Sequence, residues 1–317
     1  MSEQKNTADV IIVGGGPAGL SAALWCAELR MKTILFEKEA YFGGQLLRIY
    51  NPITNYIGLE TKNGREMRDR FMSAVEKIDN NDGFIIRLQA EAANIDTAGK
   101  KVILDNGEHF SANAMIIATG VRRRKLGVDG EDAFQGKGII ESGAKEKEKV
   151  ENRIVAIVGG GDAALENALI LSDYAKKIYV IHRRADLSAR SEFLDVAKKN
   201  VKIEFRPNTT VRKFTGTGKL NAVEVANIET GRKGKIGVDF ALIRIGVEPN
   251  TELLGVELGL DDNRYLPVNN CCETGAEGVF AIGDVANPVA PTISGAAGMG
   301  AIAAKAIYLR KNLENPV

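Results

Sequence analysis

DVIIVGGGPAGL, residues 9–20, joins an apolar run to a glycine-rich turn. The run before the glycines predicts a buried β-strand, and the stretch SAALWCAELR after them predicts a helix. Gly14, Gly16 and Gly19 form a G-x-G-x-x-G motif between the two. In such a turn the first glycine permits the bend, the second lets the backbone approach a pyrophosphate, and the third lets the helix pack on the strand.

An acidic residue completes this pattern. The next apolar run, TILFE, ends at Glu37, and an acid at the end of that strand bonds a ribose hydroxyl of a dinucleotide. A glycine-rich turn by itself is weak evidence, but the strand, helix and acid together are specific. We therefore predict a dinucleotide site made by Gly14, Gly16, Pro17, Ala18, Gly19 and Glu37.

The motif recurs in RIVAIVGGGDAALENAL, residues 153–169, where Gly159, Gly161 and Ala164 take the three motif positions. The next apolar run, KIYVI, leads into the sequence HRR, residues 182–184. The separation from Gly159 to the histidine of HRR equals the separation from the first motif glycine to its acid. The second unit therefore has a histidine and two arginines where the first unit has its ribose-binding acid.

The two units are predicted to bind different dinucleotides. An acid repels the 2′-phosphate of NADPH, whereas arginines pair with it. His182, Arg183 and Arg184 therefore predict NADPH in the second unit, and Glu37 predicts FAD in the first. NADH remains an alternative, because the two arginines also fit a solvated basic turn.

The remaining segments predict an α/β fold with two Rossmann-like, three-layer ββα domains, one inserted into the other. The FAD-binding domain is expected over residues 1–121 and 248–317, and the NAD(P)H-binding domain over 122–247. Smaller expectations are a β-meander over 83–104, an exposed loop at KEKEK (145–149) and a C-terminal helix over about 294–311.

Composition excludes several classes of protein. The chain has 317 residues, 44% of them hydrophobic, and a formal net charge of +1, which fits a two-domain globular protein without a nucleic-acid-binding basic domain. No apolar run approaches the roughly 20 residues of a membrane-spanning helix. The N-terminus MSEQKNTADV lacks a signal-peptide core, and three cysteines cannot form a disulfide framework. We therefore expect a cytoplasmic protein with no metal and no membrane or nucleic-acid partner.

The order of these segments resembles the low-molecular-weight thioredoxin reductases, of the pyridine nucleotide-disulfide oxidoreductase superfamily, over essentially the whole chain. The matching segments are VGGGPAG, FGGQL, TNYIG, IIATG, VGGGDAALENAL, HRR and GVFAIGD. The resemblance implies a homodimer, further FAD contacts and a phosphate-binding turn for NADPH. The implied FAD contacts are Gly44, Gln45, Asn55, Thr119, Gly120, Asp284 and the backbone of Ile293, and the NADPH phosphates would meet Gly161, Asp162 and Ala163.

The redox cysteine pair of that family is missing. Its C-A-T-C-D type motif aligns with GKGIIESGAKEKEKVENRIVAIVGGG, so Ser142 and Lys145 take the cysteine positions and the catalytic residues stay unassigned. The thioredoxin-reductase-like ferredoxin/flavodoxin-NADP reductases, which the chain also resembles, lack the pair too. Cys26 is expected to be a buried packing residue. Cys271 and Cys272 are adjacent and join only through a strained ring, so a redox role for them is disfavoured.

A further departure concerns the nucleotide phosphate. The family's third arginine after the HRR pair is Ser188 here, and Arg190 two residues later is a candidate substitute.

The leading functional hypothesis is an FAD-dependent NAD(P)H oxidoreductase that passes electrons from the reduced flavin directly to an acceptor. The alternatives are a ferredoxin/flavodoxin-NADP reductase, a thioredoxin or disulfide reductase that uses other thiols, and a poorly catalytic flavin-binding sensor. The acceptor, a small redox protein or a small molecule, is not specified by any motif.

Overall fold

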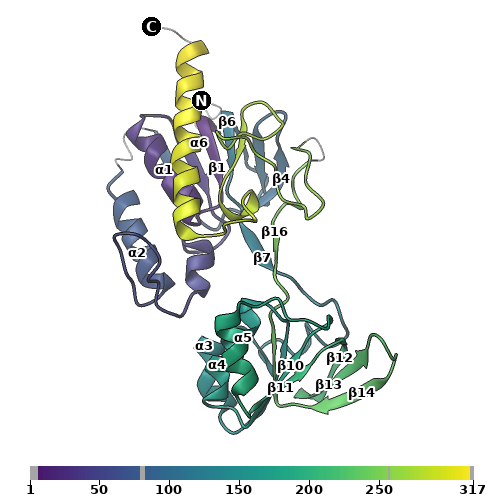
Figure 1. Ribbon diagram of the computed structural model, residues 1–317. Coiled ribbons are helices and arrows are strands. Elements are labelled where there is room, and N and C mark those ends of the chain that lie inside the picture. The colour runs from purple at the N-terminus through teal and green to yellow at the C-terminus, as the bar shows by residue number, and fades with distance from the viewer. Residues whose placement is uncertain (1–5, 79–82, 256–257, 315–317) are drawn as a thin grey trace. The chain divides into compact units, whose positions relative to one another are not determined.

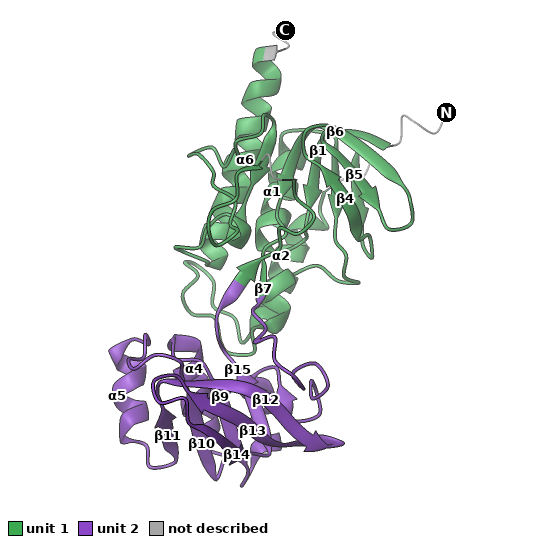
Figure 2. Ribbon diagram, turned by 90° about the vertical axis from the view of Figure 1, so that its right-hand side faces the viewer, with its two compact units in different colours: residues 1–122, 248–317 green, residues 123–247 purple. Residues whose placement is uncertain are grey.

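The computed structural model describes residues 6–78, 83–255 and 258–314, so the first five residues of the polar N-terminus lie outside it. The chain forms two compact units (Figure 2). Unit 1 is Met1–Arg122 with Glu248–Val317, and unit 2 is Arg123–Val247. The chain passes between them in β7 (Val121–Arg123) and β16 (Val247–Pro249). Unit 2 is therefore an insertion into unit 1.

Unit 1 is built on a seven-stranded sheet in the order β3-β2-β1-β6-β5-β4, with β17 also paired to β6. Strands β1, β2, β3, β6 and β17 are parallel, and β4 and β5 are antiparallel. Val13 pairs in register with Phe36 and with Ile117, so three carboxyl ends share the edge where dinucleotides bind. The strands are β1 (Thr7–Val13), β2 (Thr33–Phe36), β3 (Phe84–Arg87), β4 (Ala92–Asp96), β5 (Lys101–Leu104), β6 (His109–Ile117) and β17 (Val279–Ala281).

Successive side chains of β1 point to opposite faces of the sheet, and this alternation explains the layers of unit 1. Val10 and Ile12 pack into a core with α1 (Pro17–Glu28) and α6 (Ile293–Glu314), which lie side by side in Figure 1. Ile11 points to the opposite face, into a core with β4 to β6. Both faces are buried, as expected for parallel strands that are apolar throughout. Helix α2 (Gly64–Val75) and the 3₁₀ helices Gly44–Arg48 and Gly283–Val285 complete the unit.

Unit 2 repeats this plan. Its five-stranded parallel sheet has the order β11-β10-β9-β15-β8 and is covered on one face by α3 to α5 and on the other by the antiparallel sheet β12-β13-β14. The sheet strands are β8 (Ile139–Ile140), β9 (Ile154–Val158), β10 (Lys177–Ile181), β11 (Ile203–Arg206) and β15 (Phe240–Ile243). The other elements are β12 (Thr209–Thr217), β13 (Lys219–Asn227), β14 (Lys233–Gly237), α3 (Gly143–Glu146), α4 (Asp162–Ser172) and α5 (Ser191–Lys199). The predicted fold class, two Rossmann-like α/β domains, is confirmed.

Two smaller expectations are wrong. The meander over 83–104 excludes β3, which pairs in parallel with β2 at the far edge of the sheet and buries Phe84 in the core beside α1. The KEKEK segment is not an exposed loop, since it ends α3 and continues as a 3₁₀ helix over Lys147–Val150. Glu146 within it is only 9% exposed. Its carboxylate accepts hydrogen bonds from two backbone N–H groups at the start of α3.

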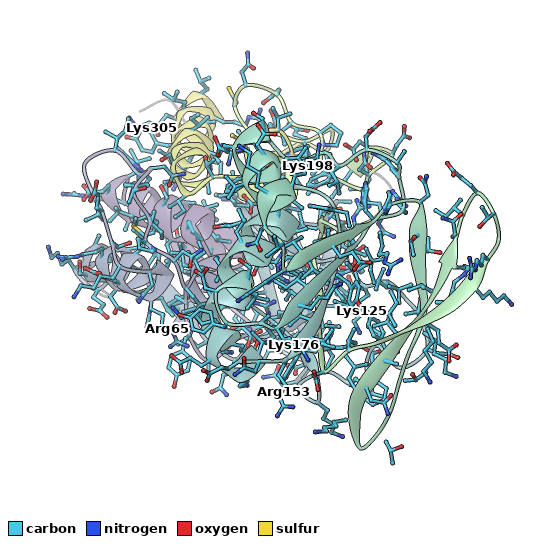
Figure 3. All side chains as sticks on the ribbon, turned by 60° about the horizontal axis from the view of Figure 1, so that its bottom comes forward. Arg65, Lys125, Arg153, Lys176, Lys198 and Lys305 are labelled. Carbon is cyan, nitrogen blue, oxygen red and sulfur yellow. The ribbon has the colours of Figure 1, made fainter. Side chains whose placement is uncertain are left out.

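In the part of the chain that the structure covers, no helix has the length and apolar character needed to cross a membrane. The basic side chains labelled in Figure 3 come from separate elements, among them Arg65 on α2, Lys198 on α5 and Lys305 on α6. Positive charge is thus distributed along the chain rather than concentrated in one helix, in keeping with the net charge of +1.

Candidate functional site: two glycine-rich turns

The first glycine-rich turn joins β1 to α1. Gly14 has a φ of 110°, and a Cβ added to it would lie 2.4 Å from the Ala118 carbonyl oxygen. A Cβ on Gly19 would lie 1.9 Å from the Gly14 carbonyl oxygen, whereas a Cβ on Gly16 would meet nothing within 4 Å. The fold itself thus requires the first and third glycines, and the second leaves open space above the backbone. This division of roles fits a pyrophosphate site.

The acid at the end of β2 is hydrogen-bonded to the backbone of this turn. Glu37 Oε2 accepts a hydrogen bond of 2.8 Å from the Gly15 N–H, and Oε1 accepts one of 2.9 Å from the Glu39 N–H. Gly15 was missed by the sequence prediction, although a Cβ there would lie only 2.2 Å from the Phe42 ring. The middle position of the GGG sequence was the feature from which this requirement for glycine could have been predicted.

The FGGQL segment lies against the same turn. A Cβ on Gly44 would approach the Gly16 Cα to 3.2 Å, and Gly44 has a φ of 50°. Gln45 donates from Nε2 to the Val121 carbonyl oxygen at 2.7 Å. Gly44 is therefore brought to the turn by the 3₁₀ helix that it begins, and Gln45 is bonded to the segment after β6.

Asp284 is a half-buried carboxylate that follows β17. Its neighbour Gly283 has a φ of 71°, and a Cβ there would lie 2.8 Å from the Ala18 Cβ, which places this segment beside the start of α1. Burial raises the pKa of the Asp284 carboxyl. Among the residues that the structure describes, none gives this carboxylate a hydrogen bond or an ion pair. Because buried acceptors are normally satisfied, Asp284 suits a ligand that carries hydroxyl groups.

The other predicted FAD contacts differ in the number of hydrogen bonds and packing contacts that hold them in position. Thr119 donates from Oγ1 to the Asn250 carbonyl oxygen at 2.8 Å, and the Asn250 N–H donates to the Gly120 carbonyl oxygen at 3.0 Å. Ile293 begins α6, where the first backbone N–H groups lack helical partners, and it packs on the cluster around Leu46. Asn55 is exposed, and no hydrogen bond ties it to the turn among the described residues.

The second turn, between β9 and α4, repeats the first. Gly159 has a φ of 145°, and a Cβ there would lie 2.0 Å from the Arg244 carbonyl oxygen. A Cβ on Gly161 would meet no atom closer than 3.7 Å, so the space above it is open. A Cβ on Gly160 would lie 2.5 Å from His182 Nδ1. Gly160 and His182 thus stand in the relation of Gly15 and its acid in unit 1.

The HRR segment follows β10. His182 Nε2 lies 3.0 Å from the Asp186 carbonyl oxygen and donates to it. Burial lowers the pKa of His182, and the charges of Arg184 and Arg183 lower it further against that hydrogen bond, so the ring is neutral at neutral pH. Arg183 and Arg184 are exposed, and neither guanidinium makes an ion pair or hydrogen bond within the described part of the chain.

Arg190, the candidate third arginine, is engaged elsewhere. Asp162, the first residue of α4, accepts hydrogen bonds of 2.7 Å from the backbone N–H and from Nε of Arg190. The backbone bond and then the guanidinium keep the pKa of Asp162 below its usual value. Arg190 also pairs with Glu192 at 2.9 Å. It therefore neutralises the acid at the helix start, so of these three arginines Arg183 and Arg184 are the two with unengaged guanidinium groups among the described residues.

Ser142 and Lys145 form a helix start. Ser142 is the N-cap of α3, and its Oγ accepts from the Lys145 N–H at 3.4 Å. Glu146 accepts from the Glu141 N–H at 2.7 Å and from the Ser142 N–H at 3.3 Å. Burial raises the pKa of Glu146, but these bonds and Lys149 Nζ at 3.0 Å outweigh it, so the pKa is lowered. The segment is a hydrogen-bonded cap without a thiol.

The three cysteines are free thiols. Burial raises the pKa of Cys26 to about 12 and that of Cys272 to about 11, so both are protonated and weakly nucleophilic at neutral pH. Cys271 is exposed, whereas Cys272 is buried in the core beside α1 and α6.

Residues 8–300 match the family model of the pyridine nucleotide-disulphide oxidoreductases. The chain belongs to this family. The thioredoxin reductase of Peptoclostridium litorale is 32% identical over 308 residues, which cover 95% of this chain and 96% of the relative. The ferredoxin--NADP reductase of Picrophilus torridus is also 32% identical, over 321 residues that cover 97% and 95% of the two chains.

The fold agrees with this assignment. The solved thioredoxin reductase of Lactococcus lactis, in its FR conformation, superposes with a TM-score of 0.82 at 30% identity and covers 95% of this chain and 98% of its own. The predicted resemblance to low-molecular-weight thioredoxin reductases is confirmed. This pyridine nucleotide-disulphide oxidoreductase is an FAD-dependent NAD(P)H oxidoreductase, as predicted, and its cofactors are FAD and NADPH.

Proposed function

We propose that this oxidoreductase takes electrons from NADPH onto FAD and delivers them from the flavin directly to an acceptor, without a cysteine relay. The observation that carries the proposal is the capped start of α3. Ser142 and Lys145 stand in the aligned cysteine positions, and no C-x-x-C sequence occurs anywhere in the chain. A relay requires two sulfurs that open and close a disulfide, and a hydroxyl and an ammonium do neither.

In this proposal unit 1 holds FAD. The open space above Gly16 receives the pyrophosphate, and Glu37, which has lone pairs beyond its two backbone bonds, accepts from ribose hydroxyls. Asp284, which accepts no hydrogen bond from any residue that the structure describes, accepts from the ribityl chain, while Gly44 and Gln45 line the ring. Bound FAD supplies the group that accepts a hydride from NADPH.

Unit 2 holds NADPH by the same logic. The open space above Gly161 receives the pyrophosphate at the start of α4, where backbone N–H groups favour an anion. Arg183 and Arg184, which pair with no carboxylate in the described ranges of the chain, bind the 2′-phosphate. His182 keeps the place of the acid without its negative charge, so nothing there repels the phosphate.

The acceptor is the open part of the proposal. A relative named ferredoxin--NADP reductase supports a small redox protein, and a quinone, a small oxidant or dioxygen are alternative acceptors of the flavin's electrons. Disulfide reduction is the second candidate, supported by the relatives named thioredoxin reductase, and it would depend on Cys271 and Cys272 or on the partner's own thiols. A poorly catalytic flavin-binding sensor is the third.

The deciding experiment has two stages. Anaerobic NADPH should bleach the flavin of the purified protein rapidly, whereas absence of bleaching would favour the sensor. NADPH consumption is then compared with ferricyanide, a quinone, ferredoxin, flavodoxin and thioredoxin, in wild type and in Cys271→Ser/Cys272→Ser. Turnover with a non-disulfide acceptor that survives both substitutions supports the proposal. Robust thioredoxin turnover in either protein would overturn it.

We also propose a homodimer in the cytoplasm. Ile302, Leu309 and Leu313 are 44%, 62% and 82% exposed, and their spacing puts them on one side of α6. Free Cys26, Cys271 and Cys272 suit a reducing compartment. Light scattering should give twice the mass of the chain, and Leu309→Lys should shift it toward the monomer; a monomeric wild type would refute the dimer.

A further inference from the structure

A buried arginine lies beside the second glycine-rich turn and has no role in the function proposed above. Arg244 follows the last residue of β15 and is only 6% exposed. Its guanidinium donates from Nη1 to the Ile243 carbonyl oxygen at 2.8 Å and from Nη2 to the Glu141 carbonyl oxygen at 2.6 Å. Its Nε is also buried and has no hydrogen-bond partner in the part of the chain described.

The charge of Arg244 is poorly compensated. No carboxylate among the described residues forms an ion pair with it; Glu166 and Glu146 act on it only at a distance, and Arg123 opposes its charge. Burial, with the charge of Arg123, lowers the pKa of Arg244 to about 10, so it remains a cation at neutral pH. A buried cation with an unbonded N–H raises the free energy of the folded protein unless an acceptor binds that N–H.

The sheet order tells where that acceptor comes from. Strands β10, β9 and β15 are consecutive neighbours in the sheet, and the direction in which the chain adds strands changes between β9 and β15. Ligands of open α/β sheets bind at the carboxyl ends of the strands at such a point. Arg244 lies at this edge, with its carbonyl oxygen against Gly159.

A dinucleotide laid across this edge has a fixed direction. The HRR segment at the end of β10 takes the adenosine ribose, and the turn after β9 takes the pyrophosphate. The remaining half of the nucleotide must then extend over the end of β15, toward Arg244 and the Glu141 carbonyl that it binds. The adenosine half, by contrast, lies on the other side of β9.

We propose that Arg244 is a nucleotide-binding residue whose Nε–H donates to an oxygen of the nicotinamide half of NADPH. This inference rests on the proposed binding of NADPH by unit 2. It assigns the second nucleotide half to the residue that follows β15, whereas Arg183 and Arg184 recognise the first.

The test compares two ligands that share only the adenosine half. NADP⁺ and 2′,5′-ADP are titrated calorimetrically into the FAD-loaded protein, into Arg244→Met and Arg244→Lys, and into the control variant Arg183→Ala. Arg244→Met should weaken NADP⁺ about tenfold or more, the usual effect of losing a charge-assisted bond, and should leave 2′,5′-ADP within about twofold of wild type. Arg244→Lys retains the charge but lacks the Nε–H, so it should recover stability without recovering NADP⁺ affinity. Arg183→Ala should weaken both ligands.

Three outcomes would overturn the inference. Equal weakening of NADP⁺ and 2′,5′-ADP by both Arg244 variants, with a lowered unfolding temperature, would make Arg244 a support of the turn only. Unchanged NADP⁺ affinity in a folded Arg244→Met or Arg244→Lys would show that the nicotinamide half is held by other groups. If wild type binds neither ligand, the proposed NADPH site in unit 2 fails, and the inference fails with it.

Discussion

Glu37 accepts a hydrogen bond from the N–H of Gly15 at 2.8 Å, and a Cβ on Gly15 would lie 3.1 Å from that same carboxylate oxygen. The acid and the turn are therefore held together by the fold, with no side chain between them. In unit 2 the His182 ring lies against Gly160, where an added Cβ would lie 2.5 Å from Nδ1. In both units the residue after the second strand therefore lies against the middle glycine of the turn, an acid in unit 1 and a histidine in unit 2.

Neighbouring glycines in the first turn should respond differently to alanine. Gly15→Ala places a methyl group 2.2 Å from the Phe42 ring, and overpacking of this kind costs about 1–3 kcal/mol. Gly16→Ala meets nothing within 4 Å, so it should leave the stability of the FAD-free protein unchanged while obstructing the pyrophosphate. Unfolding temperature and flavin absorbance, measured on both variants, separate the two effects. A yellow, fully FAD-loaded Gly16→Ala would contradict the site.

NADPH should be preferred over NADH, with Arg183 responsible for much of the difference. Arg183→Ala should lower kcat/KM for NADPH about tenfold, the lower end for a bond between charged groups because the side chain is exposed. NADH should be nearly unaffected. Arg190→Ala is the comparison variant: it leaves the Asp162 carboxylate unpaired beside the pyrophosphate that both nucleotides share, so it should affect NADPH and NADH alike. A wild type that prefers NADH, with Arg183→Ala unchanged, would refute the prediction.

Asp284→Asn should have opposite effects on the FAD-free and FAD-loaded proteins. The folded pKa of Asp284 is raised by burial above its usual value of 3.8, so its contribution to stability is present in acid and is lost as pH rises through the raised pKa. At neutral pH the ionised carboxylate therefore destabilises the FAD-free fold, and asparagine should raise its unfolding temperature, less so near pH 3.8. FAD should bind the variant more weakly. Equal stability of the two FAD-free proteins at neutral pH would argue against this account.

A thiol reagent should find one fast-reacting cysteine in the native protein. Cys271 is exposed, whereas the pKa values of Cys26 and Cys272 are raised to about 12 and 11, and reagents attack the thiolate. Cys271→Ser should abolish the fast phase, and denaturant should expose all three thiols of the wild type. Two fast thiols, or a missing pair restored by reductant, would mean that Cys271 and Cys272 form a redox couple.

The features that could be predicted from the sequence are those that depend on local chemistry. The motif glycines, Glu37 and HRR could be predicted as site residues because a tight turn, a pyrophosphate and a ribose each demand a residue type at a set separation along the chain. Apolar runs such as DVIIV likewise predict buried parallel strands whatever packs on them. The absence of a C-x-x-C pair is a property of the sequence alone.

The features that could not be predicted from the sequence depend on packing between segments that are far apart along the chain. Arg190 looks like a phosphate-binding arginine in the sequence, but the fold brings it to Asp162, 28 positions away. Strand β3 adjoins an apparent meander, yet burial of Phe84 draws it to the opposite edge of the sheet. Arg244 in LIRIGVEPN carries no motif signal, and its importance arises from strand order, which buries its charge beside Gly159. Each depends on contacts between distant segments, whose free energy is set by the assembled core and not by neighbours along the chain.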